Sequence, residues 1–214
     1  IENVQLGNID LTFASSAPVA SFAPEFFAFD IPFLFTNRKQ AYAVLDGEIG
    51  TEIMNSLKDK GIVGLAYWEN GFRQLTNSKN ELFTALQQGI FDAQEGPINL
   101  FYDMKFNEVQ KFITKTNHIY SPWPLLASPD KLATLSAKDR VIFDAAVKDA
   151  TAYQRKLAQE ADDKAEAAMT NVKFTTLTPE ELSLFVQKAA PIDDLVKEKA
   201  GADLVNRLLS ATKK

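Results

Sequence analysis

The chain has 214 residues, a mass of 23.8 kDa and a net charge of −5 at neutral pH. Its length allows a sizeable core, and 46% apolar with 24% charged residues is the balance of a folded globular protein, which excludes disorder as the main state. The acidic net charge makes the chain a poor candidate for a nucleic-acid-binding protein, which needs a basic surface. No apolar run reaches the roughly 18 residues of a membrane span, so we expect no membrane-embedded segment.

The cysteine and histidine counts limit the chemistry further. The chain has no cysteine and one histidine, which excludes disulfides, thiol nucleophiles, zinc–thiolate sites and multi-histidine metal sites. We therefore predict no metal and no cofactor. The chain begins with Ile-Glu-Asn rather than Met, so we expect its front to be processed, cut or incompletely represented.

The first third of the chain predicts short helices around a strand and a loop. Residues 1–7 resemble the end of a helix that Gly7 closes, and alternation over 9–13 predicts a strand. Residues 22–35 are aromatic and interrupted by prolines, so we expect packed loop and short helix there. Asn37 is a suitable N-cap for the next helix. The following elements are helices over about 39–45 and 50–60, the second ending at Gly61, and a strand over 62–68 buried on both faces.

The middle and the end of the chain predict further helices and strands. Ser136 begins a helix without Gly or Pro to about residue 170, roughly 50 Å long, which should brace two lobes through an apolar stripe including Ile142, Tyr153 and Leu157. Thr178 begins another helix, which Pro191 interrupts. Before them we predict a helix over 81–88, a strand over 90–93, a helix over 98–107, an extended segment over 109–114 and a strand with a proline bend over 117–127.

A short internal repeat suggests that the two lobes are built alike. Residues 2–11 and 81–93 each give a helix, a glycine stop and a G-x-x-D strand, followed by polar residues. In open α/β sheets ligands lie beyond the carboxyl ends of strands, so residues 14–16 and 94–96 are expected at one cleft. Coincidence is the alternative reading of this repeat. Asp10 and Asp92 could suggest paired carboxylates, but their matching places in the two repeats favour repeated structure instead.

The polar residues at these strand ends allow a structural and a functional reading. Arg73 either forms an ion pair with Glu69 or Glu95, which the residues alone favour, or binds a carboxylate through its planar guanidinium. Ser15 and Ser16 suit ordinary turn chemistry or a ligand contact. The same choice holds for three residues that end the second repeat: Gln94, Glu95 and Gly96.

The aromatic residues and the histidine favour structural roles. Trp68 and Phe72 at a strand end belong more often to a core than to a pocket wall, and Trp123 fits a cleft or a hinge equally well. His118 lacks a positioned nucleophile, so we interpret it as structural.

No motif for covalent, nucleotide or metal chemistry is present, so we predict no catalytic residue and no enzyme. The enzyme alternative is an α/β protein acting on a small carboxylate with Glu95 or Asp92 as the base. A helical scaffold organised by residues 137–210 is the second alternative.

In their order along the chain, a series of short stretches resembles the extracytoplasmic solute-binding proteins of TRAP transporters, the DctP-like family. Each stretch is weak alone, but together they cover nearly all of the chain. They are residues 7–11, 29–35, 44–47, 68–73, 84–97, 106–112 and 116–118.

The resemblance implies a two-lobed periplasmic-binding-protein-like α/β fold that closes on a small organic acid and delivers it to membrane permease subunits in the periplasm. It implies strands near 65–77 and 118–127 crossing between the lobes. It places Arg73 in the cleft, Ser15 toward the ligand and Gly96 where some members carry an asparagine. The predicted lobes are 1–70 plus 122–161 and 71–121 plus 162–214, and the predicted ligand-binding residues are Ser15, Ser16, Trp68, Glu69, Arg73, Gln94, Glu95 and Gly96.

The chain also departs from the family. The resemblance implies blocks before Ile1 and between Asn80 and Glu81 that this sequence does not show, so we expect that the chain either joins pieces of a longer protein or is a shortened variant. In the family, the second block holds the arginine that usually binds the ligand carboxylate. The ligand stays open among C4-dicarboxylates, sugar acids and other 2-oxo or hydroxy acids. Sialic acid is disfavoured, because Ser15 stands where some sialic-acid-binding relatives carry a glutamate.

Overall fold

The computed structural model describes residues 1–77 and 93–212. Its α-helices are α1 (Glu2–Gln5), α2 (Ser16–Val19), α3 (Arg38–Leu45), α4 (Glu48–Asn55), α6 (Ile98–Asp103), α7 (Pro129–Ala133), α8 (Ala137–Ala168), α9 (Pro179–Ala189), α10 (Ile192–Ala200) and α11 (Ala202–Thr212). Its 3-10 helices are η1 (Pro24–Asp30), η2 (Lys58–Lys60) and η3 (Phe106–Glu108), and its strands are β1 (Leu11–Phe13), β2 (Val63–Asn77), β3 (Ala93–Pro97), β4 (Phe112–Ala127) and β5 (Lys173–Thr176).

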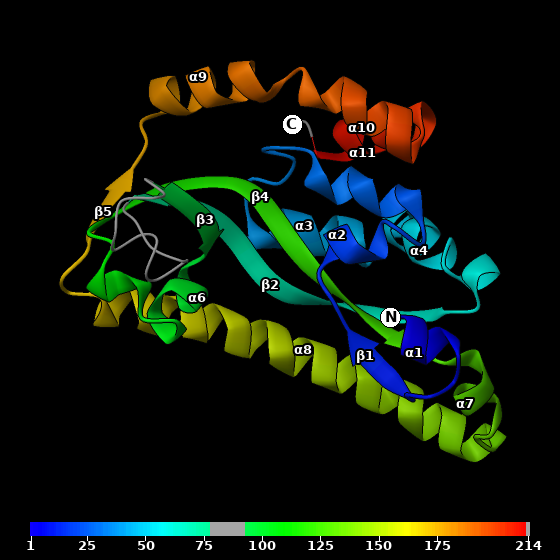
Figure 1. The fold of residues 1–214 in the computed structure, drawn as a ribbon. Helices are drawn as coiled ribbons and strands as arrows, with labels where there is room; N and C mark the ends of the chain where they lie inside the picture. Colours follow the sequence, from blue (N-terminus) through cyan, green and yellow to red (C-terminus); the bar gives the residue numbers. More distant parts are fainter. Residues whose placement is uncertain (78–92, 213–214) are drawn as a thin grey trace.

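The described strands form one sheet with helices on both sides (Figure 1). The order is β1-β4-β2-β3 with antiparallel pairs throughout, and β5 joins β4 in parallel. The long strands β2 and β4 cross the molecule together, as the resemblance implied. Their register shifts after Gly64, Glu69 and Arg73, so irregular pairing interrupts the ladder repeatedly.

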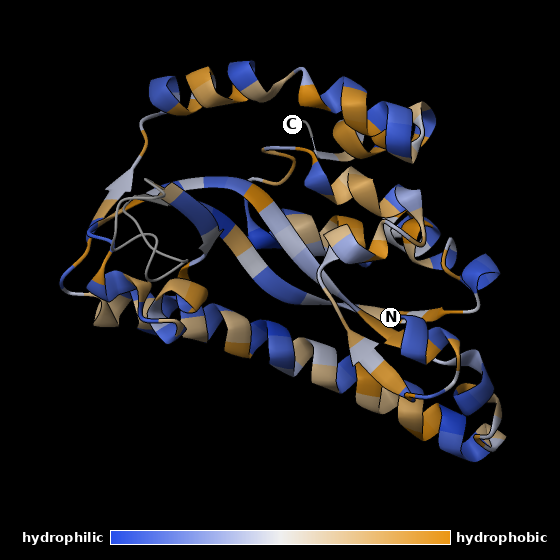
Figure 2. Cartoon of the chain, viewed as in Figure 1, coloured by the Kyte–Doolittle hydropathy of each residue, from blue (hydrophilic) through white to orange (hydrophobic). Residues whose placement is uncertain are grey.

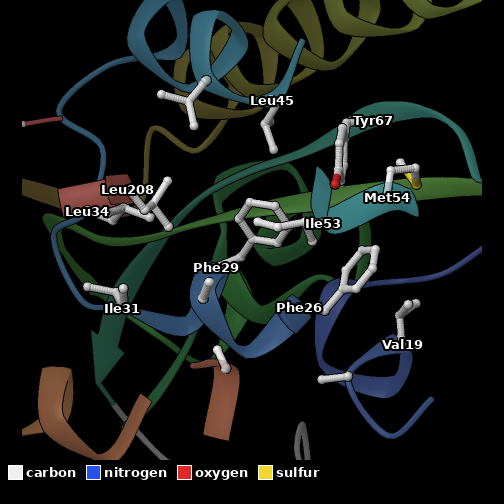
Figure 3. Close-up of a cluster of buried hydrophobic side chains, with 14 of the residues drawn as sticks. Val19, Phe26, Phe29, Ile31, Leu34, Leu45, Ile53, Met54, Tyr67 and Leu208 are labelled. Carbon is white, nitrogen blue, oxygen red and sulfur yellow. The ribbon is translucent and has the colours of Figure 1, made fainter. Parts of the chain in front are cut away.

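The larger hydrophobic core lies between the sheet and the helices opposite α8. Figure 3 labels ten of the side chains that it draws from this core, including Phe26 and Phe29 from the aromatic segment and Leu208 from the C-terminal helix. Phe29 packs edge to face against Tyr67 of β2, with ring centroids 5.5 Å apart. The aromatic run over 22–35 is therefore core-forming 3-10 helix and loop, as predicted.

A separate, smaller core forms where α8 ends. It consists of Ile98, Phe101, Phe106, Ile113, Ala165 and Met169. The two cores are joined by β2, β4 and α8, which agrees with two lobes braced by one helix. Val196 and Leu208 lie in the larger core, so α10 and α11 pack with the N-terminal elements, whereas the predicted division places residues 162–214 in the other lobe.

The helix starts confirm the capping predictions. The Asn37 side chain accepts from the Gln40 amide at 2.9 Å, and Ser136 accepts from the Asp139 amide at 3.1 Å. Thr178 forms a complete capping box with Glu181. Helix α8 has 32 residues, which corresponds to about 48 Å.

The buried face of α8 differs from the prediction. Ile142, Tyr153 and Leu157 are 58%, 62% and 43% exposed, whereas Thr151 and Asp162 are buried. Figure 2 shows polar and apolar segments mixed along this helix. The reason is that α8 packs on a polar part of the sheet, where buried side chains must form hydrogen bonds.

The strands also differ from the prediction in length. β2 continues to Asn77 instead of ending at residue 68, and the extended segments over 109–114 and 117–127 form the single strand β4. The predicted helix 98–107 ends as α6 at Asp103 and resumes as η3 after Lys105, whose φ is 56°. The predicted helix over 81–88 and most of the strand over 90–93 lie outside the described residues. No helix in the described part is both long and apolar enough to span a membrane.

Candidate functional site

Two of the predicted site residues form an ion pair that joins β2 to β3. Arg73 of β2 binds the Glu95 carboxylate with both Nε and Nη2. Glu95 lies opposite Leu75 in the ladder, so Arg73 reaches its partner diagonally on the same face of the sheet. The Arg73 and Glu95 side chains are 27% and 39% exposed, so solvent can reach this bidentate pair.

His118 of β4 extends this pair. Its Nε2 lies 3.4 Å from a Glu95 carboxylate oxygen, and its Nδ1 lies 2.7 Å from the Thr116 hydroxyl. Burial alone would raise the pKa of Glu95. Hydrogen bonds from His118 and Arg73, together with their charges, outweigh it and lower this pKa to about 2.

The end of η1 approaches the same place from the larger core. The Phe33 amide donates to the His118 carbonyl at 2.7 Å, and Phe33 has a φ of 57°, which is uncommon for an aromatic residue. Asp30 lies close enough to Arg73 to feel its charge. Burial raises the pKa of Asp30 and the nearby guanidinium only partly offsets this effect. Arg73, Glu95 and His118 therefore form one cluster from three strands, and Asp30 of η1 lies within electrostatic range of Arg73.

The other residues predicted at the ends of the first and second repeats are Ser15, Ser16, Gln94 and Gly96. Ser15 is the half-buried N-cap residue of α2 and its side chain makes no capping hydrogen bond, while Ser16 is buried. The Gln94 amide donates to the Gln110 side chain at 2.7 Å. Gly96 lies under α6, and an added Cβ would be 3.3 Å from a Phe101 ring carbon.

Trp68 and Glu69 have partners away from Arg73. The Trp68 indole donates to the Thr151 hydroxyl of α8 at 3.1 Å and its ring packs against Phe13. Glu69 is 1% exposed and binds Arg38 of α3 instead of Arg73. Of the eight residues predicted for the site, the structure thus brings Arg73 and Glu95 into direct contact.

The structure adds two residues that sequence reasoning did not place at the site. His118 was interpreted as structural, and Asp30 was not singled out. A signal for Asp30 existed, because it is a carboxylate within the otherwise aromatic run over 22–35. His118 carried no comparable signal, since its neighbour Glu95 comes from a different strand.

The described residues also enclose cavities beside the long helix. One of about 580 Å³ lies between α4, β2 and α8, and another of about 460 Å³ lies between α3, β4 and α8. Arg73 and Glu95 line neither of them. Within residues 1–77 and 93–212, no group of three or more Asp, Glu or His side chains is arranged to hold a metal ion.

A sequence model of the bacterial extracellular solute-binding proteins, family 7 (DctP), matches residues 1–82 and 78–199. These matches span most of the chain. The chain belongs to this family. The two matched segments meet at residues 78–82, where the resemblance placed a missing block.

Individual relatives agree with the DctP assignment. A solute-binding protein of Verminephrobacter eiseniae is 33% identical over 249 residues, covering 99% of this chain and 74% of that protein. Because this alignment is longer than the 214 residues of the chain, the relative carries aligned segments that this chain lacks.

Solved structures of DctP-like proteins share the fold. The sugar acid binding protein DctPAm from Advenella mimigardefordensis, in complex with galactonate, is 35% identical with a TM-score of 0.90, covering 99% of this chain and 81% of that one. A TRAP periplasmic solute-binding protein from Sulfurospirillum deleyianum with bound succinate is 30% identical with a TM-score of 0.86, covering 99% and 83%. The predicted two-lobed binding-protein fold is therefore confirmed, with this chain representing part of it.

Proposed function

We propose that this chain captures a small organic acid between its two lobes, outside the cytoplasm, and delivers it to the membrane subunits of a TRAP transporter. Family membership supports the transport role. The observation that carries the ligand class is Arg73, a permanently charged guanidinium held at the junction of β2, β3 and the end of η1. Glu95 contacts its Nε and Nη2, and the Nη1 group is not among the atoms that Glu95 contacts.

The charges around Arg73 favour a sugar acid over a dicarboxylate. Asp30 and Glu95 both lie near the guanidinium, and a second ligand carboxylate beside them would be repelled. Hydroxyl groups, in contrast, donate hydrogen bonds to carboxylates. We therefore propose a monocarboxylate with several hydroxyls, the class represented by the galactonate bound to DctPAm.

We propose Ser15, Ser16, Gln94 and Gly96 as further ligand contacts at the strand ends. Trp68 and Glu69 are better assigned to supporting roles, because Thr151 and Arg38 occupy their polar atoms. The proposed lobes follow the two hydrophobic cores, so residues 192–212 join the N-terminal lobe.

The enzyme alternative is less well supported. A general base works best with a pKa near the working pH, whereas the Glu95 pKa is lowered to about 2. Asp92, the other proposed base, lies outside the described residues. The relatives reported above are also solute-binding proteins by name.

A thermal-shift titration tests the proposed function. An acid at one hundred times its Kd stabilises the protein by about 2.7 kcal/mol, which raises the Tm of a chain this size by roughly 5–10 °C. We expect galactonate to act more strongly than succinate. Arg73→Lys should weaken binding about tenfold or more, because a lysine cannot hold Glu95 and a ligand with one planar fork.

The matched control is Arg140→Lys, at an exposed arginine that pairs with Asp144 within α8. It should leave the titration unchanged. Equal ligand shifts in the Arg73→Lys protein and the wild type, or no shift with any small carboxylate, would refute the proposal.

A further inference from the structure

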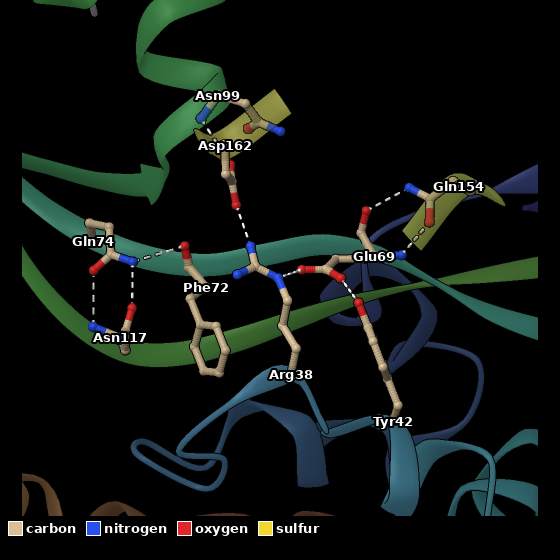
Figure 4. A network of polar contacts seen from close by, with 9 residues as sticks. All are labelled: Arg38, Tyr42, Glu69, Phe72, Gln74, Asn99, Asn117, Gln154 and Asp162. Atoms are coloured by element: carbon tan, nitrogen blue, oxygen red, sulfur yellow. Dashed lines mark hydrogen bonds and ion pairs between the residues drawn. The ribbon is translucent and has the colours of Figure 1, made fainter. Parts of the chain in front are cut away.

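Arg38 occupies an unusual position for a cation. It is the first residue of α3, where the positive end of the helix dipole disfavours a basic side chain. Figure 4 shows its guanidinium between two carboxylates. Nε lies 2.5 Å from Glu69 and Nη2 lies 2.6 Å from Asp162. We call these three residues the hinge clasp.

Glu69 fixes one end of the hinge clasp to the elements of the larger core. Its side chain is 0% exposed, and the Tyr42 hydroxyl of α3 donates to its second carboxylate oxygen. The Gln154 amide of α8 also pairs with the Glu69 backbone amide and carbonyl, both at 2.8 Å. This part of β2 is therefore held against both α3 and α8.

Asp162 fixes the other end to the elements of the smaller core. Its Oδ1 accepts from the Asn99 amide at 3.2 Å, in the first turn of α6. Pro97 precedes that helix and makes no side-chain cap, so Asp162 satisfies a helix amide that would otherwise lack a partner. Ala165, one turn further along α8, belongs to the smaller core. Arg38 thus bridges an element of each core.

The backbone beneath the hinge clasp is adapted to it. Gly71 follows the register shift after Glu69 and has a φ of +109°. An added Cβ there would lie 3.2 Å from Asp162 Oδ2, so glycine suits both the backbone conformation and the close approach of Asp162. The cavity of about 460 Å³ is lined by Arg38, Asp162 and Gln74, which leaves space beside the bridge for the elements to move.

We propose that Arg38, by binding Glu69 and Asp162 together, is a positioning residue that sets the angle between the two lobes and slows their opening. The proposal rests on the proposed function, in which the ligand binds between these lobes. A largely buried group of two carboxylates and one guanidinium is a weak source of stability, because desolvation opposes the attraction. Its stronger effect is to specify one arrangement of the elements that it connects.

The absence of cysteine makes a direct test simple. Exposed Lys58 and Asp103, near the larger and the smaller core, are replaced by cysteine and spin-labelled, and pulsed electron paramagnetic resonance gives the distance between the labels. We expect a narrow distribution for the parent protein. Asp162→Asn and Arg38→Lys should both shift or broaden it, since lysine cannot reach both carboxylates as the guanidinium does.

Asp163→Asn is the control, because this exposed neighbour on α8 carries the same charge outside the hinge clasp. It should leave the distribution unchanged. If both hinge-clasp variants keep the parent distribution at pH 8 while remaining folded by circular dichroism, the proposal is wrong. If Asp162→Asn does not fold, the distance distribution of Arg38→Lys alone decides whether the proposal holds.

Ligand release separates this proposal from the proposed function. With galactonate as the probe, Asp162→Asn should release ligand about fivefold faster or more, and Asp163→Asn at the parent rate. Unchanged release together with unchanged distances overturns the hinge clasp. If the parent protein binds no small carboxylate, the proposed function fails, and the label distances still decide whether the hinge clasp sets the lobe angle.

Discussion

Replacing Gly71 by alanine tests the close approach between β2 and α8. Gly71 has a φ of +109°, a conformation that costs an alanine about 1–3 kcal/mol. The new Cβ would also lie 3.2 Å from Asp162 Oδ2, so the carboxylate must move from its place beside Arg38 and Asn99. Weakening hydrogen bonds to a charged group adds about 1.5–3 kcal/mol.

Gly201 provides a matched control for the backbone cost. It has a similar φ of +93°, and nothing lies within 4 Å of its added Cβ. Gly201→Ala should therefore show the conformational cost alone. The difference between the two variants isolates the contact with Asp162, about 2 kcal/mol, which corresponds to a Tm difference of about 4–8 °C in a chain this size.

Differential scanning calorimetry of the wild type and both variants measures this difference. We expect Gly71→Ala to melt clearly below Gly201→Ala. The same Tm for both variants would show that Asp162 yields without cost and would refute the reasoning. In the Asp162→Asn background, Gly71→Ala should lower the Tm by less than it does in the wild type, because the side chain that the new Cβ displaces then carries no charge.

Three further predictions concern single groups. Because the Glu95 pKa is lowered to about 2, the stability that its ionised carboxylate contributes is present above its unfolded pKa near 4.5 and is lost as the pH falls toward 2. Urea titrations should find no such loss in Glu95→Gln. A loss well above about 1 kcal/mol in the wild type would contradict the solvent exposure of the Arg73–Glu95 pair. Burial raises the Asp162 pKa to about 6 despite Arg38, with Glu69 adding to the increase, so stability should fall by on the order of 2 kcal/mol as the pH rises from 4 to 7. Asp162→Asn should flatten that slope, and an unchanged slope would assign it to another group. Thr178→Ala removes the capping box of α9 and should cost about 1 kcal/mol, seen as faster amide exchange in the first turn of that helix; unchanged exchange would mean that the cap contributes nothing.

Local sequence signals predicted the helix starts well. Asn37, Ser136 and Thr178 each cap the helix that was expected, because capping depends on residues only three positions apart. The face that α8 buries could not be predicted in the same way. Thr151 and Asp162 are buried through partners in β2, α3 and α6, which are distant in the sequence.

The candidate site was likewise only partly predictable, because its contacts join residues that are distant in the sequence. The residues alone already favoured an ion pair of Arg73 with Glu69 or Glu95, and the structure selects Glu95. The choice depends on the register of β2 against β3, which brings Glu95 within diagonal reach. Glu69 pairs with Arg38 of α3 instead, and nothing in the spacing of charges along the chain indicates that partner.

The composition of the larger core has a consequence for how the protein folds. Its members run from Val19 near the start of the chain to Leu208 near its end. Phe26 and Phe29 come far earlier in the sequence than α11, which packs with them in this core. Contacts this distant in sequence form slowly, since a long loop must close before burial compensates the lost entropy. A chain in which α11 has not yet docked therefore leaves this aromatic-rich core incomplete, and exposed apolar surface of this kind favours aggregation.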